Sequence, residues 1–389
     1  MTVWDDLVGQ EPAVAVLRKA VAGAAARLRG ESGTATNGMT HAWLITGPPG
    51  SGRSNAGRAF AAALQCLTDG CGECAVCRTA LNGAHPDVSL IRTELLSIRV
   101  SEIRDLVRRA AMSPTQGGWQ VMVVEDADRL TEQAADALLK SIEEPAARTV
   151  WVLCAPTVED VVPTIRSRCR LLVLRTPPVA AVAEMLTRQS GVEPELAGFA
   201  ARAAQGHIGR AKALARDVEV RSRRTRVLEV PFELHDIGAC LKAAQRLVDA
   251  AKEEAKASAA KVDEKERAEL EQALGVGTKG ARPREAGAAL KELEDQQKAR
   301  AKRWERDVLD RSLVDLMALY RDVLVLQTGA GAELINAELS QDIQRLASRT
   351  TAEQTIRRID ALTGCREAIE GNVAPLLALE AMTIALFEG

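Results

Sequence analysis

Aromatic residues and an excess of charge are what this chain lacks most. Phe, Trp and Tyr together make up 3% of its 389 residues, and 51 basic residues nearly balance 53 acidic ones. The net charge of −2 gives no support for a protein that coats nucleic acid with a basic surface. Scarce aromatics also argue against a stand-alone, zinc-containing nucleic-acid binder, which would need side chains on which bases stack.

Long apolar runs are absent as well. No stretch approaches the ~18 apolar residues of a membrane span, and the N-terminal residues 1–7 are acidic, without an apolar signal core. We therefore expect a cytoplasmic protein with no membrane contact, whose eight cysteines stay reduced and are considered first as metal ligands. Apolar residues still amount to 47%, enough for a sizeable core, and the length predicts two or three domains.

The first 175 residues have the pattern of an α/β domain. Helical patterns such as Ile103–Ala111 and Glu132–Glu143 alternate with short apolar runs. Short buried strands joined by helices predict a parallel sheet that is covered on both faces. The expected strands are Ala42–Thr46, Val88–Ile91, Val121–Glu125, Val150–Ala155 and Leu171–Leu174.

Beyond Pro177-Pro178 the pattern is helical throughout. A small helical domain is expected over residues 176–224 and a second one over 225–389. Within the latter, residues 251–306 are rich in Lys, Glu, Arg and Ala and are interrupted by a Gly/Pro segment. This stretch is either a disordered charged insertion or a helical hairpin, and its helix propensity favours the hairpin. The helices expected in the small domain are Val179–Arg188, Glu193–Ala204 and Gly209–Ala215.

An altered phosphate-binding loop follows the first expected strand. The segment Gly-Pro-Pro-Gly-Ser-Gly-Arg-Ser fits G-x-x-x-x-G-K-[ST] at every fixed position except the lysine. Arginine keeps the charge but is longer, planar and forked. The pattern indicates descent from a nucleotide-binding site. The alternative is a loop that keeps its shape without catalysis. Its expected site residues are Gly47, Gly50 and Gly52, which let N–H groups wrap a phosphate, Arg53, and Ser54 as a Mg²⁺ ligand.

The second half of such a site is Glu125-Asp126, at the end of the third expected strand. A working site has Asp before Glu, so that Asp holds Mg²⁺ and Glu polarises the attacking water. The reversed order moves each carboxylate by about one methylene, which matters where geometry limits the chemistry. Asp126 is equally well explained as a solvated carboxylate. Together with Arg53, the reversal indicates that nucleotide turnover has been lost.

Four of the eight cysteines are clustered. Cys66, Cys71, Cys74 and Cys77 have the spacing C-x4-C-x2-C-x2-C, and four thiolates within twelve residues suit tetrahedral Zn²⁺. A [4Fe–4S] cluster and free thiols are the alternatives, although no redox partner site is evident. Because all four ligands come from the protein, the zinc is expected to be structural.

Five further sequence motifs accompany the altered loop and the cysteine cluster. They are Leu7-Val-Gly-Gln10, His85-Pro-Asp87, Ser97-Ile98 with Ile103-Arg104, Ala137-Leu-Leu-Lys-Ser-Ile-Glu-Glu-Pro145 and Pro163-Thr-Ile-Arg-Ser-Arg-Cys169. With the altered P-loop and the four cysteines, this set resembles the bacterial DNA polymerase III clamp-loader subunits of the AAA+ class. The resemblance is dense over about residues 1–220 and extends further only in helical character. The charged insertion is longer than the resemblance leads us to expect.

Within that family, motor subunits of the gamma/tau type have an intact P-loop lysine and the Asp-Glu order. Subunits of the delta-prime type are similar to this chain in lacking a competent ATP site while keeping the Ser-Arg-Cys segment. Arg53 and Glu125-Asp126 therefore favour the delta-prime type, with an active ATPase motor subunit as the alternative. The segment Gly206-His-Ile-Gly-Arg210 resembles the sensor-2 region and adds Arg210 to the degenerate site. Ala155-Pro156 departs from the polar sensor-1 position.

The resemblance implies a zinc-bearing AAA+ domain, a lid and a collar that joins a hetero-pentamer with gamma/tau and delta subunits. The complex would open the ring-shaped beta sliding clamp and place it on primer-template DNA. ATP and Mg²⁺ would act in the neighbouring subunit, this chain's own ATPase activity is expected to be absent, and the polymerase reaction, a nucleotidyl transfer, would belong to another subunit.

The resemblance also implies a role for Arg168. Pro163 favours the start of a short helix after the fourth strand, and a helix that carries Ser167, Arg168 and Cys169 puts Arg168 at the rim of the domain. There it would be an arginine finger that stabilises charge on a neighbour's γ-phosphoryl group. An ordinary surface charge is the alternative, and Arg166 is the rival for the role.

Overall fold

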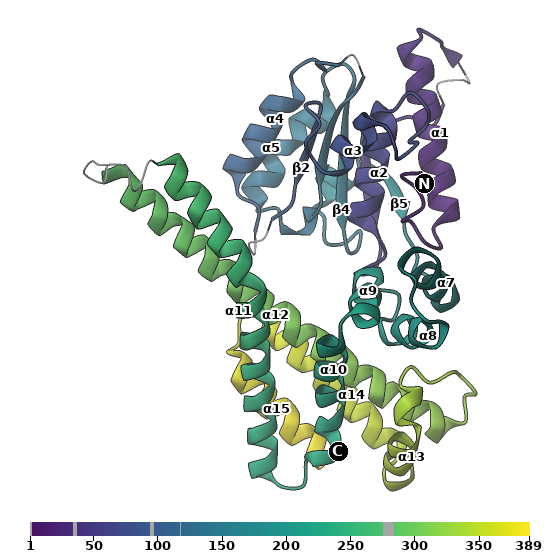
Figure 1. Cartoon of the computed structure of the whole chain (residues 1–389), viewed down its shortest axis with the longest axis vertical. Coiled ribbons are helices and arrows are strands. Elements are labelled where there is room, and N and C mark those ends of the chain that lie inside the picture. Colours follow the sequence, from purple (N-terminus) through teal and green to yellow (C-terminus); the bar gives the residue numbers. More distant parts are fainter. Residues whose placement is uncertain (1, 34–36, 94–96, 117, 275–283) are drawn as a thin grey trace. The chain divides into compact units, whose positions relative to one another are not determined.

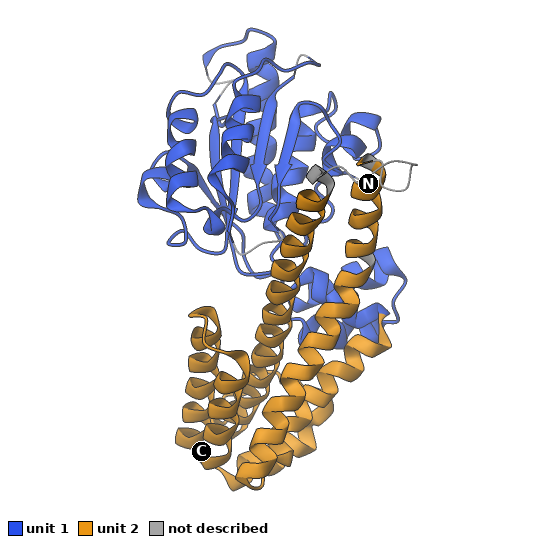
Figure 2. Ribbon diagram, turned by 90° about the vertical axis from the view of Figure 1, so that its left-hand side faces the viewer, with its two compact units in different colours: residues 1–216 blue, residues 217–389 orange. Residues whose placement is uncertain are grey.

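The computed structural model describes residues 2–33, 37–93, 97–116, 118–274 and 284–389. The chain forms two compact units, residues 1–216 and 217–389 (Figure 2). The first contains the P-loop, the cysteine cluster and Arg168, and the second is helical. Among the described residues, no helix is long and apolar enough to cross a membrane.

The first unit is built on a five-stranded parallel sheet with the strand order β2-β3-β4-β1-β5 (Figure 1). The predicted parallel sheet is confirmed, and every strand begins and ends within one residue of its expected position. Strand β1 lies between β4 and β5, so that Ile45 is paired with Cys154 on one side and with Leu172 on the other. The strands are β1 (Ala42–Thr46), β2 (Val88–Ile91), β3 (Gln120–Val124), β4 (Thr149–Ala155) and β5 (Arg170–Val173).

Helices cover both faces of this sheet. Successive residues of a strand point to opposite faces, so Trp43 and Ile45 of β1 join a core with α1 and α2, whereas Leu44 joins a second core with α4 and α5. The elements in this part are α1 (Glu11–Leu28), α2 (Arg53–Gln65), α3 (Ala75–Leu81), α4 (Val100–Ala110), the 3-10 turn η2 (Ala127–Arg129), α5 (Glu132–Glu143) and α6 (Pro163–Arg166).

Three short helices follow β5 and belong to the same compact unit. The sequence predicts three helices here, and the structure has them at nearly the expected positions. Gly191 ends the first with a φ of +62°, a left-handed conformation that glycine adopts at little cost. They are α7 (Val179–Ser190), α8 (Pro194–Ala203) and α9 (Ile208–Arg216).

The second unit has an aliphatic core in which Tyr320 is fully buried. A buried charge network adds to it, because the guanidinium of Arg224 contacts Asp315, Asn336 and Glu338. The elements of this unit are α10 (Val218–Glu233), α11 (Ile237–Ala273), α12 (Arg284–Thr328), the 3-10 turn η3 (Ala337–Leu339), α13 (Ser340–Arg349), α14 (Ala352–Glu370) and α15 (Pro375–Glu388).

The charged stretch 251–306 falls in α11 and α12, and its Gly/Pro segment, 275–283, lies outside the described residues. The two helices are joined by side chains. Arg300 pairs with Asp263 and Glu266 across the helix pair, and the side-chain amide of Gln297 donates to the Asp263 carbonyl at 3.1 Å. The described part is helical on both sides of the Gly/Pro segment, as the hairpin interpretation expects.

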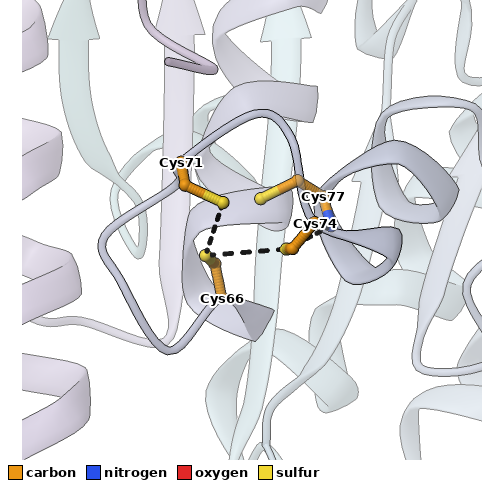
Figure 3. Close-up of side chains that lie close together, drawn as sticks. All are labelled: Cys66, Cys71, Cys74 and Cys77. Carbon is orange, nitrogen blue, oxygen red and sulfur yellow. Dashed lines mark hydrogen bonds between the residues drawn. The ribbon is translucent and has the colours of Figure 1, made fainter. Parts of the chain in front are cut away.

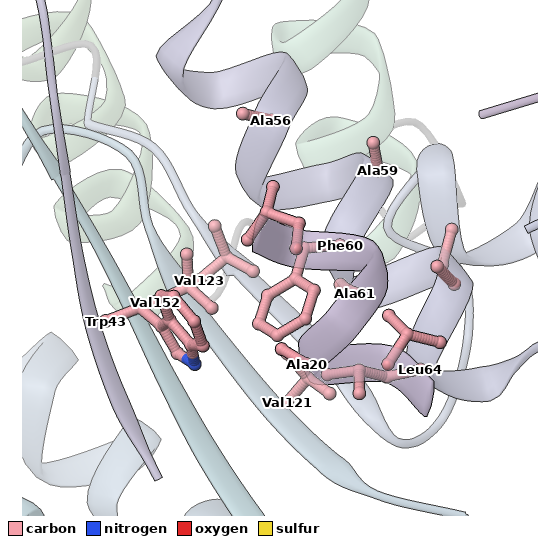
Figure 4. Close-up of a cluster of buried hydrophobic side chains, with 14 of the residues drawn as sticks. Ala20, Trp43, Ala56, Ala59, Phe60, Ala61, Leu64, Val121, Val123 and Val152 are labelled. Atoms are coloured by element: carbon pink, nitrogen blue, oxygen red, sulfur yellow. The ribbon is translucent and has the colours of Figure 1, made fainter. Parts of the chain in front are cut away.

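Helix α2 lies close to the sheet because its buried face is made mainly of small residues. A Cβ on Gly57 would stand 3.1 Å from Val123 Cγ1 and 3.4 Å from Val152 Cγ1. The ring of Phe60 meets that of Trp43 edge to face, with the centroids 5.3 Å apart. The buried residues of α2, most of which Figure 4 labels, are Ala56, Gly57, Ala59, Phe60, Ala61, Ala62, Ala63 and Leu64.

We expect Gly57→Leu to lower the free energy of unfolding of the first unit by about 1–3 kcal/mol, the usual effect of overpacking a core. Urea denaturation of the full chain measures it. Gly198 in α8 offers a matched control, because a Cβ there meets the flexible end of the Arg202 side chain at 3.5 Å. Gly198→Leu should change the stability by less than about 1 kcal/mol. Wild-type stability of Gly57→Leu would contradict the close approach of α2 to the sheet.

Candidate functional site

The P-loop connects β1 to α2 in the strand–loop–helix order that the sequence predicts. Gly50 has a φ of +79°, and Gly52 precedes α2 with a φ of +96°, both left-handed values that favour glycine. Gly47 follows β1 directly, and Ser54 lies half-buried in the first turn of α2. The backbone of a phosphate-binding loop is therefore present.

The side chain of Arg53 is turned back onto this loop. Its Nη1 donates a hydrogen bond to the carbonyl oxygen of Gly47. Burial lowers the pKa of Arg53, whereas the Cys154 thiol and the carboxyl groups of Asp128 and Asp126 act against that shift. The guanidinium thus satisfies a carbonyl of its own loop and has acidic groups as its electrostatic neighbours.

The two carboxylates after β3 have different surroundings. Glu125 is 6% exposed, and its Oε1 forms an ion pair with Nε of Arg58, a residue of α2. Asp126 is half-buried at the start of η2. Burial raises the pKa of Asp128, two residues further on. Glu125, one of the two predicted remnants of a Mg²⁺ site, is therefore neutralised by an arginine of the same unit.

The beginning of α9 abuts the P-loop. The N–H of Ile208 donates to the carbonyl oxygen of Gly50 at 3.3 Å. A Cβ built on Gly50 would lie 2.4 Å from the Cα of His207, so only glycine fits at this position. Arg210 lies in the first turn of α9, half-buried, and its backbone N–H donates to Nδ1 of His207 at 3.2 Å. The predicted sensor-2-like segment and the P-loop thus meet through His207 and Ile208.

The four clustered cysteines converge from the end of α2, the loop after it and the start of α3 (Figure 3). Cys66 follows the last residue of α2, and Cys74 precedes α3, in whose first turn Cys77 is buried. All four Sγ atoms lie within 4.8 Å of one another, and Cys66 Sγ is 3.8 Å from that of Cys71 and 4.0 Å from that of Cys74. A tetrahedral zinc with bonds of about 2.3 Å sets its sulfurs about 3.8 Å apart. The cluster has the ligand type, number and spacing for zinc.

Backbone N–H groups favour thiolates in this cluster. The N–H of Thr68 lies 3.4 Å from Cys66 Sγ, and that of Cys77 lies 3.3 Å from Cys74 Sγ. Burial raises the pKa of Cys66, but hydrogen bonds, first among them that of the Thr68 side chain, outweigh it and bring the pKa to about 6. Burial raises the pKa of the Cys77 thiol. A bound cation would compensate the cost of ionising this buried ligand.

Arg168 lies in the turn after α6 and is exposed. The helix begins at Pro163 as predicted but ends at Arg166, so the expectation that it carries Arg168 is wrong. Arg168 Nη1 donates to the carbonyl oxygen of Thr164 at 2.7 Å, and Nη2 lies 2.5 Å from Oε1 of Glu143, with the two charged side chains 39% and 44% exposed. Its rival, Arg166, is half-buried.

Three partners of the site residues are not predicted from the sequence. They are Arg58, Glu143 and His207. Arg58 and Glu125 are 67 residues apart, and nothing in the local pattern pairs them. Glu143 and His207 each lie in a segment that resembles the clamp-loader family. The resemblance therefore locates these segments, but it assigns no role to the two residues.

A parallel sheet with a P-loop after β1 and three short helices after β5 defines a P-loop protein of the AAA+ class. Two family models match the chain, "DNA polymerase III, delta subunit" over residues 28–178 and "DNA polymerase III, delta subunit, C terminal" over residues 289–386. Together with its relatives, these matches show that the chain belongs to the bacterial DNA polymerase III clamp-loader subunits of the delta-prime type.

The relatives differ in how much of their length is matched. DNA polymerase III subunit delta′ of Bacillus subtilis is 26% identical over 90% of this chain and 92% of its own length. The delta′ subunit of Pseudomonas aeruginosa is 38% identical over 40% of this chain. The match covers 49% of that relative, so the chain spans about half of its length. The gamma/tau subunit of Mycobacterium tuberculosis is 31% identical over 40% of this chain and 28% of its own length.

Solved structures with a similar fold include a RuvB variant of Thermotoga maritima, with a TM-score of 0.40 and 17% identity over 58% of this chain and 72% of that one. A gamma subunit-related protein of Thermotoga maritima has a TM-score of 0.39 and 16% identity over 89% of this chain and 93% of its own.

We expect one zinc ion per chain in freshly purified protein, measured with iron by elemental analysis. Cys74→Ser should lose most of the zinc and unfold at a lower temperature, because three thiolates cannot close the site. Cys169→Ser, which changes a half-buried cysteine outside the cluster, should keep its zinc. Less than about half an equivalent of zinc without iron would remove the assignment, and stoichiometric iron would favour an iron–sulfur cluster.

Proposed function

We propose that this chain is a catalytically silent AAA+ subunit of a bacterial clamp loader, of the delta-prime type, that helps to place the sliding clamp on primed DNA. It works in a cytoplasmic hetero-pentamer with gamma/tau and delta subunits and reaches the beta clamp and primer-template DNA through that complex. The polymerase reaction belongs to another subunit of the holoenzyme. The main support for catalytic silence is the side chain of Arg53 held on the carbonyl of Gly47, and the pairing of Glu125 with Arg58 adds to it.

Two charged groups that a working site needs are already engaged within this chain. The P-loop cation must reach the β- and γ-phosphates, but Arg53 donates to its own loop. A catalytic carboxylate must face the attacking water, but Glu125 is buried against Arg58. Opening that pair beside ATP would place an unpaired carboxylate near phosphates of like charge. These contacts support a P-loop fold kept for its shape.

The isolated chain should therefore not hydrolyse ATP. Arg53→Lys should not restore turnover, because Glu125 stays paired with Arg58 and Ala155-Pro156 still follows the pattern of a degenerate site. Phosphate release with Mg²⁺ and ATP measures this, and a gamma/tau motor subunit assayed in parallel is the positive control. Robust turnover by the wild-type chain would favour the motor-subunit alternative. Robust turnover by Arg53→Lys alone would show that one residue accounts for the silence.

The same proposal assigns Arg168 the role of an arginine finger that acts on the ATP of a neighbouring subunit. Its exposure, and its place beyond the end of α6, support this role. An exposed ion pair is worth about 0–1 kcal/mol. A neighbour's γ-phosphate, with more negative charge and several acceptor oxygens, can therefore replace Glu143 as the partner of Arg168.

Arg168→Ala should leave assembly of the reconstituted complex intact but lower its DNA- and clamp-stimulated ATPase rate by at least about twofold. An arginine finger raises the rate of hydrolysis about 10³–10⁵-fold at its own ATP site. Only one of the several ATP sites in the complex loses its finger here. The matched control is Arg166→Ala, two residues earlier at the end of α6 and half-buried, which should have a smaller effect. If Arg168→Ala assembles and loads clamps like the wild type, Arg168 is an ordinary surface charge.

A further inference from the structure

Residues 3–10 form an N-terminal strap before α1 whose first residues are fixed to the loop between the first two cysteines of the cluster. The N–H of Val3 donates to the Gly70 carbonyl at 3.0 Å, and the indole Nε1 of Trp4 donates to the Asp69 carbonyl at 3.1 Å. Both apolar side chains are buried. The approach is close, because a Cβ on Gly70 would stand 2.5 Å from Cγ2 of Val3.

The last residue of the strap, Gln10, is buried and joins the P-loop to the segment after β5. Its Nε2 donates to the carbonyl oxygens of Arg175 at 2.6 Å and of Ser51 at 3.4 Å, and its Oε1 accepts the N–H of Arg175 at 3.1 Å. The neighbouring Gly9 packs so tightly that a Cβ on it would stand 2.6 Å from Cδ of Pro178. One end of the strap thus holds the junction between the sheet and α7.

The strap runs alongside α2 from one end of that helix to the other. With 13 residues α2 is about 20 Å long, and the eight residues of the strap can span at most about 28 Å. Between its ends, Leu7 reaches within 3.6 Å of a Cβ built on Gly52, and Asp6 pairs with Lys212 of α9 at 3.8 Å. The strap has no helix or strand of its own, so its position depends on these contacts.

We propose that the metal-bound cysteine loop anchors the strap and that the strap, through Gln10, fixes how the P-loop meets the helices after β5. The inference rests on zinc occupying the cysteine cluster. Asp69 and Gly70 have left-handed φ values of +54° and +80°, so the chain turns tightly just before Cys71. When the metal is removed, the tetrahedral constraint on this loop is lost, and both carbonyl acceptors of the strap lose their fixed positions together.

Hydrogen exchange of the full chain, before and after zinc removal by a chelator, tests this coupling. We expect amides in residues 3–10 and 50–52, and those of Arg175 and Thr176, to exchange at least about fivefold faster without zinc, and to recover when zinc is added back. Strand β3 should stay protected. Loosening confined to residues 66–77 would overturn the inference, and so would loss of protection in β3, because the whole unit would then unfold.

Gln10→Ala tests the far end of the strap with the metal in place. We expect it to keep one zinc and protected residues 66–77, while exchange at Arg175 and Thr176 rises at least about fivefold. Glu11→Gln, an exposed neighbour, is the matched control and should change neither. Unchanged exchange at Arg175 and Thr176 in Gln10→Ala would overturn the inference.

Metal analysis of the same sample separates the failures. A chain with neither zinc nor iron removes the zinc assignment and this inference together. A zinc-loaded chain whose strap does not respond to metal removal overturns only the inference.

Discussion

The close packing of α2 on the sheet is the constraint on which both candidate sites depend. The helix carries the P-loop at its first residue and the first cysteine of the cluster just beyond its last. A Cβ on Gly57 would stand 3.1 Å from Val123 Cγ1 and 3.4 Å from Val152 Cγ1, so a larger residue here would push the helix away from β3 and β4. A chain with few aromatic residues builds this contact from alanines, which allow a shorter distance between helix and sheet than large side chains would.

Charged groups at and beside the altered P-loop have partners within the chain. A carboxylate that is buried alone costs several kcal/mol, and a partner removes much of that cost. Glu125 has Arg58 as this partner, supplied by α2, and Arg53 satisfies the carbonyl of Gly47. A nucleotide with its Mg²⁺ would supply compensating charges of its own in a working site. Here side chains of the same unit, Arg58 and Arg53, make these contacts.

The parts that the sequence predicts are those set by local pattern. The five strands could be placed because each is a short apolar run, and the cysteine cluster could be found because its four ligands lie within twelve residues. The contacts that the sequence does not predict join distant segments. Gln10 and Arg175 are 165 residues apart, and the pairing of Gly50 with His207 depends on how α9 returns to the loop. Helix α6 ends earlier than the sequence predicts, although backbone hydrogen bonds continue through the turn after Arg166.

The arginines of this chain differ in how strongly they are held, and that difference bears on which of them can change partners. The side chain of Arg224 is 4% exposed and has Asp315 and Glu338 as ion partners. Removing one member of such a buried pair costs about 3–5 kcal/mol, so Arg224 is a structural residue. Arg168 pairs with one exposed carboxylate, a contact worth about 1 kcal/mol at most. A residue that must leave its resting partner for a phosphate on another subunit needs an exposed, weak ion pair like that of Arg168. The free energy spent on breaking the resting pair is subtracted from the stabilisation that the residue gives to the transition state.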